Sequence, residues 1–176
     1  MCIDLMDKVS RTELVDGSVV SLRRLGADDS EDIVRLYDEL TDDDRYFRFF
    51  TMRPAHLASL AQSLTVRSDN QYALGAFDSG KLIGVANYIA CRTPGEAEVA
   101  VVVAHAQHLR GVGTALLRRL GEIAKNNGLH RLVAEVLAEN HLMLQVISDA
   151  GWPCTRKLDG SVLHVEIDLD AAEPNC

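Results

Sequence analysis

The sequence contains little of what marks the specialised classes of protein. Its 176 residues include four cysteines and four prolines, and its longest unbroken apolar run, 99–104, has six residues. A membrane-spanning helix needs about 20 apolar residues, so we expect no such helix and no membrane partner. Cys2, Cys91, Cys154 and Cys176 form no C-x-x-C pair and match no cysteine–histidine spacing of a zinc site. We therefore expect free thiols in a reducing compartment.

Positive charge is also scarce. The chain has 18 lysines and arginines against 26 aspartates and glutamates, which gives a net charge of -8. Duplex binding depends on a basic surface, so nucleic acid is disfavoured as the main partner. The first seven residues carry acids where a secretion signal would carry bases, which favours a cytoplasmic protein. Apolar residues make up 47% and charged residues 25%, a globular mixture that excludes a disordered chain, a collagen-like fibre and a coiled coil.

The spacing of apolar residues predicts a mixed α/β domain built around one sheet. The domain covers 12–169, between an N-terminal extension over 1–11 and a C-terminal tail over 170–176. The predicted strands cover 12–15, 18–22, 71–77, 82–90, 96–103, 131–137, 152–158 and 161–169. The predicted helices begin near residues 28, 41, 54, 114 and 141.

Short polar motifs predict how several of these elements begin or turn. Asp16-Gly17 is the signal of a two-residue hairpin turn. Asp28 with Glu31, and Thr41 with Asp44, are spaced like the capping boxes that open helices.

A glycine turn joins a strand rich in valine to a long amphipathic helix. The first N–H groups of a helix have no partner within it and carry the positive end of its dipole, so such a turn can bind an anion. Here Gly111 and Gly113 lie in the turn 108–114, and Arg110 adds a cation. Leu116 stands where a dinucleotide fingerprint has its third glycine, and the Gly-Lys-Ser/Thr of a P-loop is missing. The loop either wraps a pyrophosphate without metal or lysine, or is only a tight turn with a closely packed helix.

The segment from Glu98 to Trp152 resembles the acyl-coenzyme A binding core of the GNAT superfamily of N-acetyltransferases. The family's loop pattern, Gln/Arg-x-x-Gly-x-Gly/Ala, here reads His108-Leu109-Arg110-Gly111-Val112-Gly113, with histidine at its first position. Further on, Asn140 opens a helix and Gly151 with an aromatic residue closes it, as in the family's second signature. The resemblance implies the GNAT fold, in which a single, mostly antiparallel sheet splays into a V and is flanked by helices.

The resemblance also implies acetyl-CoA as the cosubstrate, with no metal. The strands over 96–103 and 131–137 would part at their C-terminal ends, and pantetheine would pair with the free edge of the first. His105 and His108 flank the loop, but the sequence shows no further ligands for a metal. The implied cofactor-binding residues are Val101, Val102, Val103, His108, Leu109, Arg110, Gly111, Val112, Gly113, Thr114 and Asn140.

A carboxylate at the head of the valine strand is the candidate catalytic group. Transfer to an amine requires a neutral nitrogen, and only about 0.1% of free lysine is neutral at pH 7.4. Glu98 lies thirteen residues before Gly111, where GNAT enzymes often hold their general base. The alternative is the exposed start of a strand, which is the interpretation favoured for Glu96. Many family members place a tyrosine acid seven residues after the position of Asn140, and this chain has Ile147 there, so we expect the thiolate to leave without it.

The front of the chain carries the signal for the acceptor. Residues 46–50, Tyr-Phe-Arg-Phe-Phe, resemble the opening of Pat-type protein lysine acetyltransferases, which acetylate lysines of proteins including acyl-coenzyme A synthetases. The resemblance implies Tyr46, Arg48 and Phe49 as substrate-binding residues, although the same aromatic spacing suits core packing. The acidic run 42–44 is either a solvated helix start or a region that attracts a basic substrate surface.

Three functions remain open at this stage. The first is acetyl transfer to protein lysines by direct attack, with Glu98 as general base. The second keeps the chemistry but uses a small-molecule amine as acceptor. The third is a non-catalytic module that senses acyl-CoA. The chain is expected to be a monomer or a homodimer.

Overall fold

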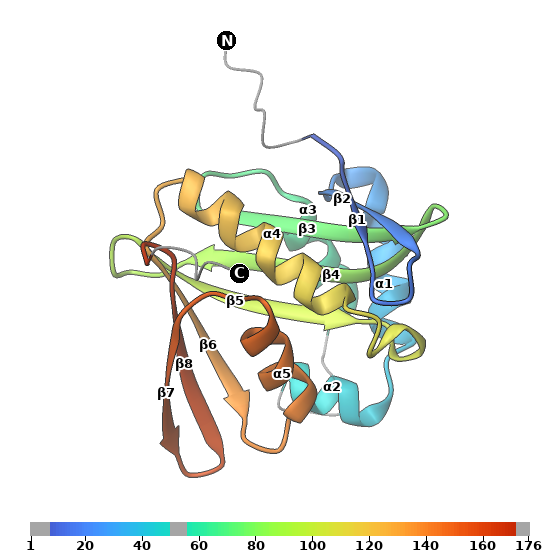
Figure 1. The fold of residues 1–176 in the computed structure, drawn as a ribbon. Coiled ribbons are helices and arrows are strands. Elements are labelled where there is room, and N and C mark those ends of the chain that lie inside the picture. The colour runs from blue at the N-terminus through green and yellow to red at the C-terminus, as the bar shows by residue number, and fades with distance from the viewer. Residues whose placement is uncertain (1–7, 50–55, 172–176) are drawn as a thin grey trace.

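The computed structural model describes residues 8–49 and 56–171, and over these residues the chain forms one eight-stranded sheet flanked by five α-helices (Figure 1). The strands are β1 (Ser10–Glu13), β2 (Val19–Arg24), β3 (Gln71–Asp78), β4 (Lys81–Ala90), β5 (Glu96–Val103), β6 (Arg131–Leu137), β7 (Cys154–Asp159) and β8 (Val162–Asp168). The helices are α1 (Ser30–Asp38), α2 (Asp42–Phe49), α3 (Leu57–Thr65), α4 (Val112–Asn126) and α5 (His141–Asp149), with 3₁₀ turns η2 (Ala27–Asp29) and η3 (His105–Gln107). The mixed α/β architecture around one sheet is thereby confirmed.

The sheet is antiparallel except at one junction, where it opens. Its strand order is β1-β2-β3-β4-β5-β6-β8-β7. β5 and β6 run parallel and pair over three positions only, the last being Glu98 opposite Val133. Beyond this pair β5 continues along β4 to Val103, whereas β6 continues along β8 to Leu137. The two halves of the sheet therefore diverge into the expected V, and beyond Glu98 no described strand pairs with the edge of β5 that faces away from β4.

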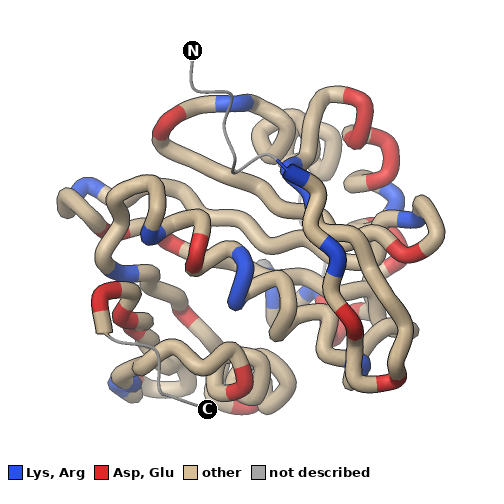
Figure 2. Tube along the Cα trace, turned by 45° about the horizontal axis from the view of Figure 1, so that its top comes forward, with Lys and Arg blue, Asp and Glu red and all other residues tan. Residues whose placement is uncertain are grey.

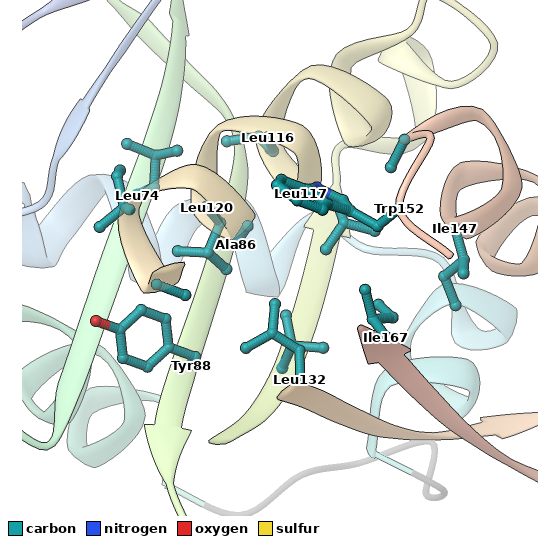
Figure 3. Close-up of a cluster of buried hydrophobic side chains, with 14 of the residues drawn as sticks. Leu74, Ala86, Tyr88, Leu116, Leu117, Leu120, Leu132, Ile147, Trp152 and Ile167 are labelled. Carbon is teal, nitrogen blue, oxygen red and sulfur yellow. The ribbon is translucent and has the colours of Figure 1, made fainter. Parts of the chain in front are cut away.

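Two apolar clusters hold the sheet, one on each face. On one face α4 packs Leu116, Leu117 and Leu120 against β3 and β4, and Figure 3 shows Trp152 beside them. These leucines recur at the helical period and are fully buried, a burial worth about 1.5–3 kcal/mol for each side chain. On the other face α1 and α3 form a second cluster that includes Val102 of β5. Packing from both sides therefore fixes the strand that borders the opening.

The first hairpin differs from the prediction in the length of its turn. The N–H of Leu14 donates to the carbonyl of Ser18 at 2.7 Å, and the N–H of Gly17 donates to the carbonyl of Leu14 at 3.0 Å. Three residues, 15–17, thus form the turn, and the two-residue prediction was wrong. The Asp16 carboxylate accepts from the backbone N–H of Ser18 at 3.0 Å and from its hydroxyl at 2.5 Å, which stabilises the longer loop.

The start of the first helix also differs from the prediction, which placed the cap at Asp28. The neighbouring Asp29 is the buried residue, and its carboxylate accepts from the N–H of Gly26 at 2.8 Å. The Arg23 guanidinium donates to both of its oxygens at 2.8 and 2.9 Å, and this pairing lowers the pKa of Asp29. A buried carboxylate needs such a partner, and the partner lies in β2, outside the local motif from which the cap was predicted.

None of the helices in the described ranges is long and apolar enough to cross a membrane. Cys91 and Cys154 are free thiols, as expected. Cys2, Cys176 and Pro54, with which the predicted third helix begins, lie outside the described residues.

Candidate functional site

A cleft of about 850 Å³ opens where the sheet splays. It is bordered by the free edge of β5, the turn before α4, the distal half of β6 and the start of α5, and on its far side by α2 and the first hairpin. Its size is that of a site for a large ligand. Of the predicted site residues, those that line it are Arg48, Glu98, Val101, Val102, Val103, His108, Leu109, Gly111, Val112, Gly113, Thr114 and Asn140. Two other described members of the predicted set, Tyr46 and Arg110, do not line it.

The turn before α4 presents unpaired backbone amides to the cleft. Gly111 caps the helix in the left-handed conformation, with φ of 88°, and no side chain caps the helix start. The first intrahelical bond runs from the N–H of Ala115 to the carbonyl of Gly111 at 3.0 Å. The N–H groups of Val112, Gly113 and Thr114 precede that bond and have no acceptor within the helix. With the positive end of the dipole behind them, amides in this arrangement are able to bind an anion.

Gly113 is required by close packing. A Cβ atom at this position would lie 3.1 Å from Cγ2 of Val146 on α5 and 3.5 Å from Cγ2 of Val103 on β5. The glycine therefore lets the start of α4 approach both neighbours. The turn is closely packed, as one interpretation of the glycine loop expected, and its first amides have no acceptor within the helix.

Arg110 does not supply the cation that the sequence placed beside these amides. Its guanidinium donates to Asp16 at 2.9 Å, to Asp78 at 3.4 Å and to the hydroxyl of Ser18 at 2.6 Å, and it also contacts Gln107. Its own carbonyl accepts from the N–H of residue 15 at 3.1 Å. Arg110 thus ties two hairpin loops to the turn. The two hydrogen bonds from Ser18, followed by that from Arg110, lower the pKa of Asp16 to about 2.

Two basic residues that the sequence reasoning missed line the cleft instead. Arg118 and Arg119 follow the turn along α4. Arg118 donates to the carbonyl of Asp149 at 2.8 Å, and Arg119 pairs with Glu122 at 3.0 Å. Helical spacing could have found Arg118, because it lies four residues after Thr114 and so shares its face of the helix. Basic and acidic residues are otherwise interspersed along the described chain (Figure 2).

The open edge of β5 offers backbone groups to an extended ligand. Val101 and Val103 are half-buried beneath α4 and pair with β4 on one side only. Unpaired strand groups of this kind can bind the amides of a ligand as an added strand. The ring of His108 donates from Nε2 to the carbonyl of Val103 at 3.0 Å, since a carbonyl can only accept. This bond fixes the start of the turn against the end of the strand.

Glu98 lies at the apex of the splay. It is exposed, it lines the cleft, and no described side chain forms an ion pair or hydrogen bond with its carboxylate. Glu96, two residues earlier on the same face, is held by Arg131 at 3.0 Å. The strand therefore carries one carboxylate held by an ion pair and one without a described side-chain partner.

Asn140 begins α5, where its side-chain oxygen accepts from the N–H of Met143 at 3.1 Å. The residue is a helix cap at the edge of the cleft, which positions α5. Ile147, at the family's tyrosine position, is only 1% exposed and packs in the core. Its side chain therefore offers no proton donor to the cleft.

Helix α2 borders the end of the cleft that we call its far mouth, which is lined by Asp44, Phe47 and Arg48. Its first turn is fixed by the N–H of Asp44, which donates to the hydroxyl of Thr41 at 3.2 Å, as the capping motif predicted. Phe47 and Arg48 line the cleft, whereas Tyr46 is half-buried with its ring 6.3 Å from that of Phe47. Phe49 belongs to α2, but its side chain lies outside the described part of the structure.

Comparison with known proteins identifies the fold and its chemistry. The sequence is 29% identical over 158 residues to acetyltransferase PA5475 of Pseudomonas aeruginosa, covering 86% of this chain and 85% of that protein. The GNAT domain of S. lividans PAT is 31% identical with a TM-score of 0.81, over 91% of this chain and 96% of that one. The yncA protein of Salmonella typhimurium, solved with acetyl-CoA, has the same fold, with a TM-score of 0.70, 19% identity and coverage of 89% and 99%. The sequence model of the acetyltransferase (GNAT) family matches residues 33–152, well over half of the chain. The chain therefore belongs to the GNAT family of acetyltransferases.

Proposed function

We propose that this protein transfers the acetyl group of acetyl-CoA to the side-chain amine of protein lysines, with Glu98 as general base. The observation that carries the proposal is the pairing of two features in one cleft. Open amides at the turn before α4 suit a diphosphate, and an unengaged carboxylate stands at the apex of the splay.

The cosubstrate would bind along the free edge of β5. Its diphosphate would accept hydrogen bonds from the N–H groups of Val112, Gly113 and Thr114. Its pantetheine amides would pair with β5 between Val101 and Val103, which brings the thioester towards Glu98. The same kind of ligand is bound by the related Salmonella protein of this fold.

The chemistry is a direct attack by the amine on the thioester. The lysine nitrogen forms a bond to the acetyl carbon while the carbon–sulfur bond breaks. Glu98 takes the proton that the nitrogen loses, directly or through a water molecule. The sulfur leaves as the coenzyme A thiolate, and the developing oxyanion is stabilised by a backbone N–H near Val103.

The choice of a protein acceptor rests on the likeness to the S. lividans PAT domain and on the far mouth of the cleft. That likeness covers nearly the whole of both chains. The mouth beside α2 carries Asp44, Phe47 and Arg48. The exposed carboxylates of Asp42 and Asp43 in the first turn of α2 would attract a basic substrate surface, and the ring of Phe47 would pack against the methylene chain of a lysine.

The acceptor is tested with radiolabelled acetyl-CoA and a cytosolic extract. We expect label on proteins, located by mass spectrometry on lysine Nζ, and much less label with Glu98→Gln. Label confined to small molecules would contradict a protein acceptor. Saturable binding of acetyl-CoA in calorimetry without transfer to any acceptor would favour the sensing module and refute the enzyme proposal.

A further inference from the structure

The fold brings a carboxylate and two imidazoles together at the far mouth of the cleft. Asp44 lies on α2, and His105 and His108 lie in the turn after β5, some 60 residues further along the chain. Oδ2 of Asp44 is 3.0 Å from Nδ1 of His105, and its Oδ1 is 4.0 Å from Nε2 of His108. One donor atom from each residue lies within 4.8 Å of the other two. Glu98 lies five residues before Val103, the residue whose carbonyl His108 contacts, which is about 16 Å along the strand, so this cluster is separate from the proposed base.

The donor set matches a transition-metal ion. Two imidazole nitrogens and one carboxylate oxygen are the ligands of many zinc sites that keep a position open. Zinc lies about 2.0–2.2 Å from such atoms, so its tetrahedral ligands are about 3.3 Å apart. The present spacing of 3.0 to 4.8 Å is thus within the reach of side-chain rotation. When the His108 ring rotates, its Nε2 gives up the hydrogen bond to the carbonyl of Val103 and binds the metal instead.

The residues around the cluster fix the positions of the three ligating side chains and place no described lysine or arginine in an ion pair with the carboxylate. The side chains of Asp44 and His108 are only 14% and 19% exposed, whereas that of His105 is 63% exposed and gives an ion access from solvent. The cap by Thr41 fixes Asp44, and η3 fixes the histidines. Among the described residues, no lysine or arginine forms an ion pair with Asp44, so the carboxylate is free for a cation.

The other histidine–carboxylate contacts among the described residues do not bring three donor atoms close to one another. Within the described ranges, His130 pairs with a single carboxylate, that of Asp170, at 2.8 Å. His164 contacts Glu135 through Nδ1 and Glu166 through Nε2, on opposite sides of its ring, and these cannot bind one ion. The cluster at α2 is therefore distinguished by geometry from ordinary surface pairs.

We propose that Asp44, His105 and His108 bind a divalent transition-metal ion, best matched by Zn²⁺, with water completing the coordination. The ion would join α2 to the turn before α4. This inference does not depend on acetyl transfer, because it concerns binding alone.

The test is a metal titration of the untagged full chain after treatment with a chelator. Co²⁺ serves as the spectroscopic probe, and Zn²⁺ is followed by calorimetry. We expect one saturable site with visible d–d absorption and no thiolate-to-cobalt charge-transfer band. Zn²⁺ at about 100 times its Kd should raise the Tm by roughly 5–10 °C.

Variants decide whether the ion lies at this cluster. His105→Gln should weaken the affinity at least about tenfold, since even the loss of an outer partner of a ligand has that effect. Asp44→Asn should act in the same direction, and circular dichroism checks the fold of both variants. The matched control His130→Gln removes a histidine that also faces one aspartate, and should leave the affinity unchanged. Absence of saturable binding, a thiolate band, or equal affinities for His105→Gln and His130→Gln would each overturn the proposal.

Discussion

Replacing Glu98 by glutamine is the sharpest test of the proposed chemistry. The substitution keeps the size and backbone of the residue but removes its ability to take a proton. Glu98 is exposed and is paired with its neighbours only through the strand, so the fold should be unaffected. The stability of the variant is expected to stay within about 0.5 kcal/mol of the parent.

The size of the effect follows from the state of the amine. A lysine with a pKa near 10.4 is about 0.1% neutral at pH 7.4, a deficit of about 4 kcal/mol that the base helps to overcome. Removal of a positioned base typically costs about 10²–10⁴-fold in rate. We therefore expect kcat of Glu98→Gln to fall by about 10²–10³-fold near pH 7. The residual rate of the variant should rise about tenfold per pH unit towards pH 10, because the fraction of lysine that is neutral rises by the same factor.

The assay is initial-rate acetylation of a lysine substrate between pH 6 and 9. Glu96→Gln is the matched control, because Glu96 shares the strand and face of Glu98 but is held by Arg131. It should retain full kcat with the parent pH profile. The reasoning is refuted if Glu98→Gln keeps full turnover across this range, or if both variants lose activity equally.

Three further predictions concern the scaffold around the cleft. Leu109 is 85% exposed with φ of 64°, so Leu109→Gly should relieve strain and raise stability in urea by about 0.5 kcal/mol, and a loss would contradict this. Arg110→Ala should raise the Asp16 pKa from about 2, and carboxyl NMR that finds it unchanged would show the ion pair to be unimportant. Asp29→Asn should lower stability by about 1–2 kcal/mol at pH 7, since a charged hydrogen-bond pair with Arg23 is lost. The pKa of Asp29 is lowered, so its contribution is present above about pH 4 and disappears as the pH falls through the folded pKa. Urea titrations should therefore show the full difference between parent and variant at pH 7, and a difference that shrinks steadily as the pH is lowered below about 4.

The part of the site that local pattern encodes could be predicted from the sequence. The valine strand, the glycines at 111 and 113, and the helix after them lie within one continuous segment, and the structure has each of them. The divergence of β5 and β6 beyond Glu98 was also predicted, because the resemblance of that segment to the GNAT family implies it. Periodicity and turn chemistry act over a few residues, which is why these features were accessible.

What the sequence could not show are pairings between distant segments. Arg110 was expected at the phosphate, but Asp16 and Asp78 come from two hairpins that only the folded sheet brings beside it. The choice of Asp29 over its neighbour depends on Arg23 in another element. His105 lacked a third partner in the sequence because that partner lies on α2. Charged side chains select partners in space, and spacing along the chain does not record that choice.

The central claim is that the backbone amides at the start of α4 bind the diphosphate of the acyl carrier. A crystal structure of the protein with acetyl-CoA tests it most directly. We predict diphosphate oxygens within about 3.2 Å of the N–H groups of Val112, Gly113 and Thr114, with the thioester facing Glu98. A diphosphate bound at any other place on the chain would contradict the account.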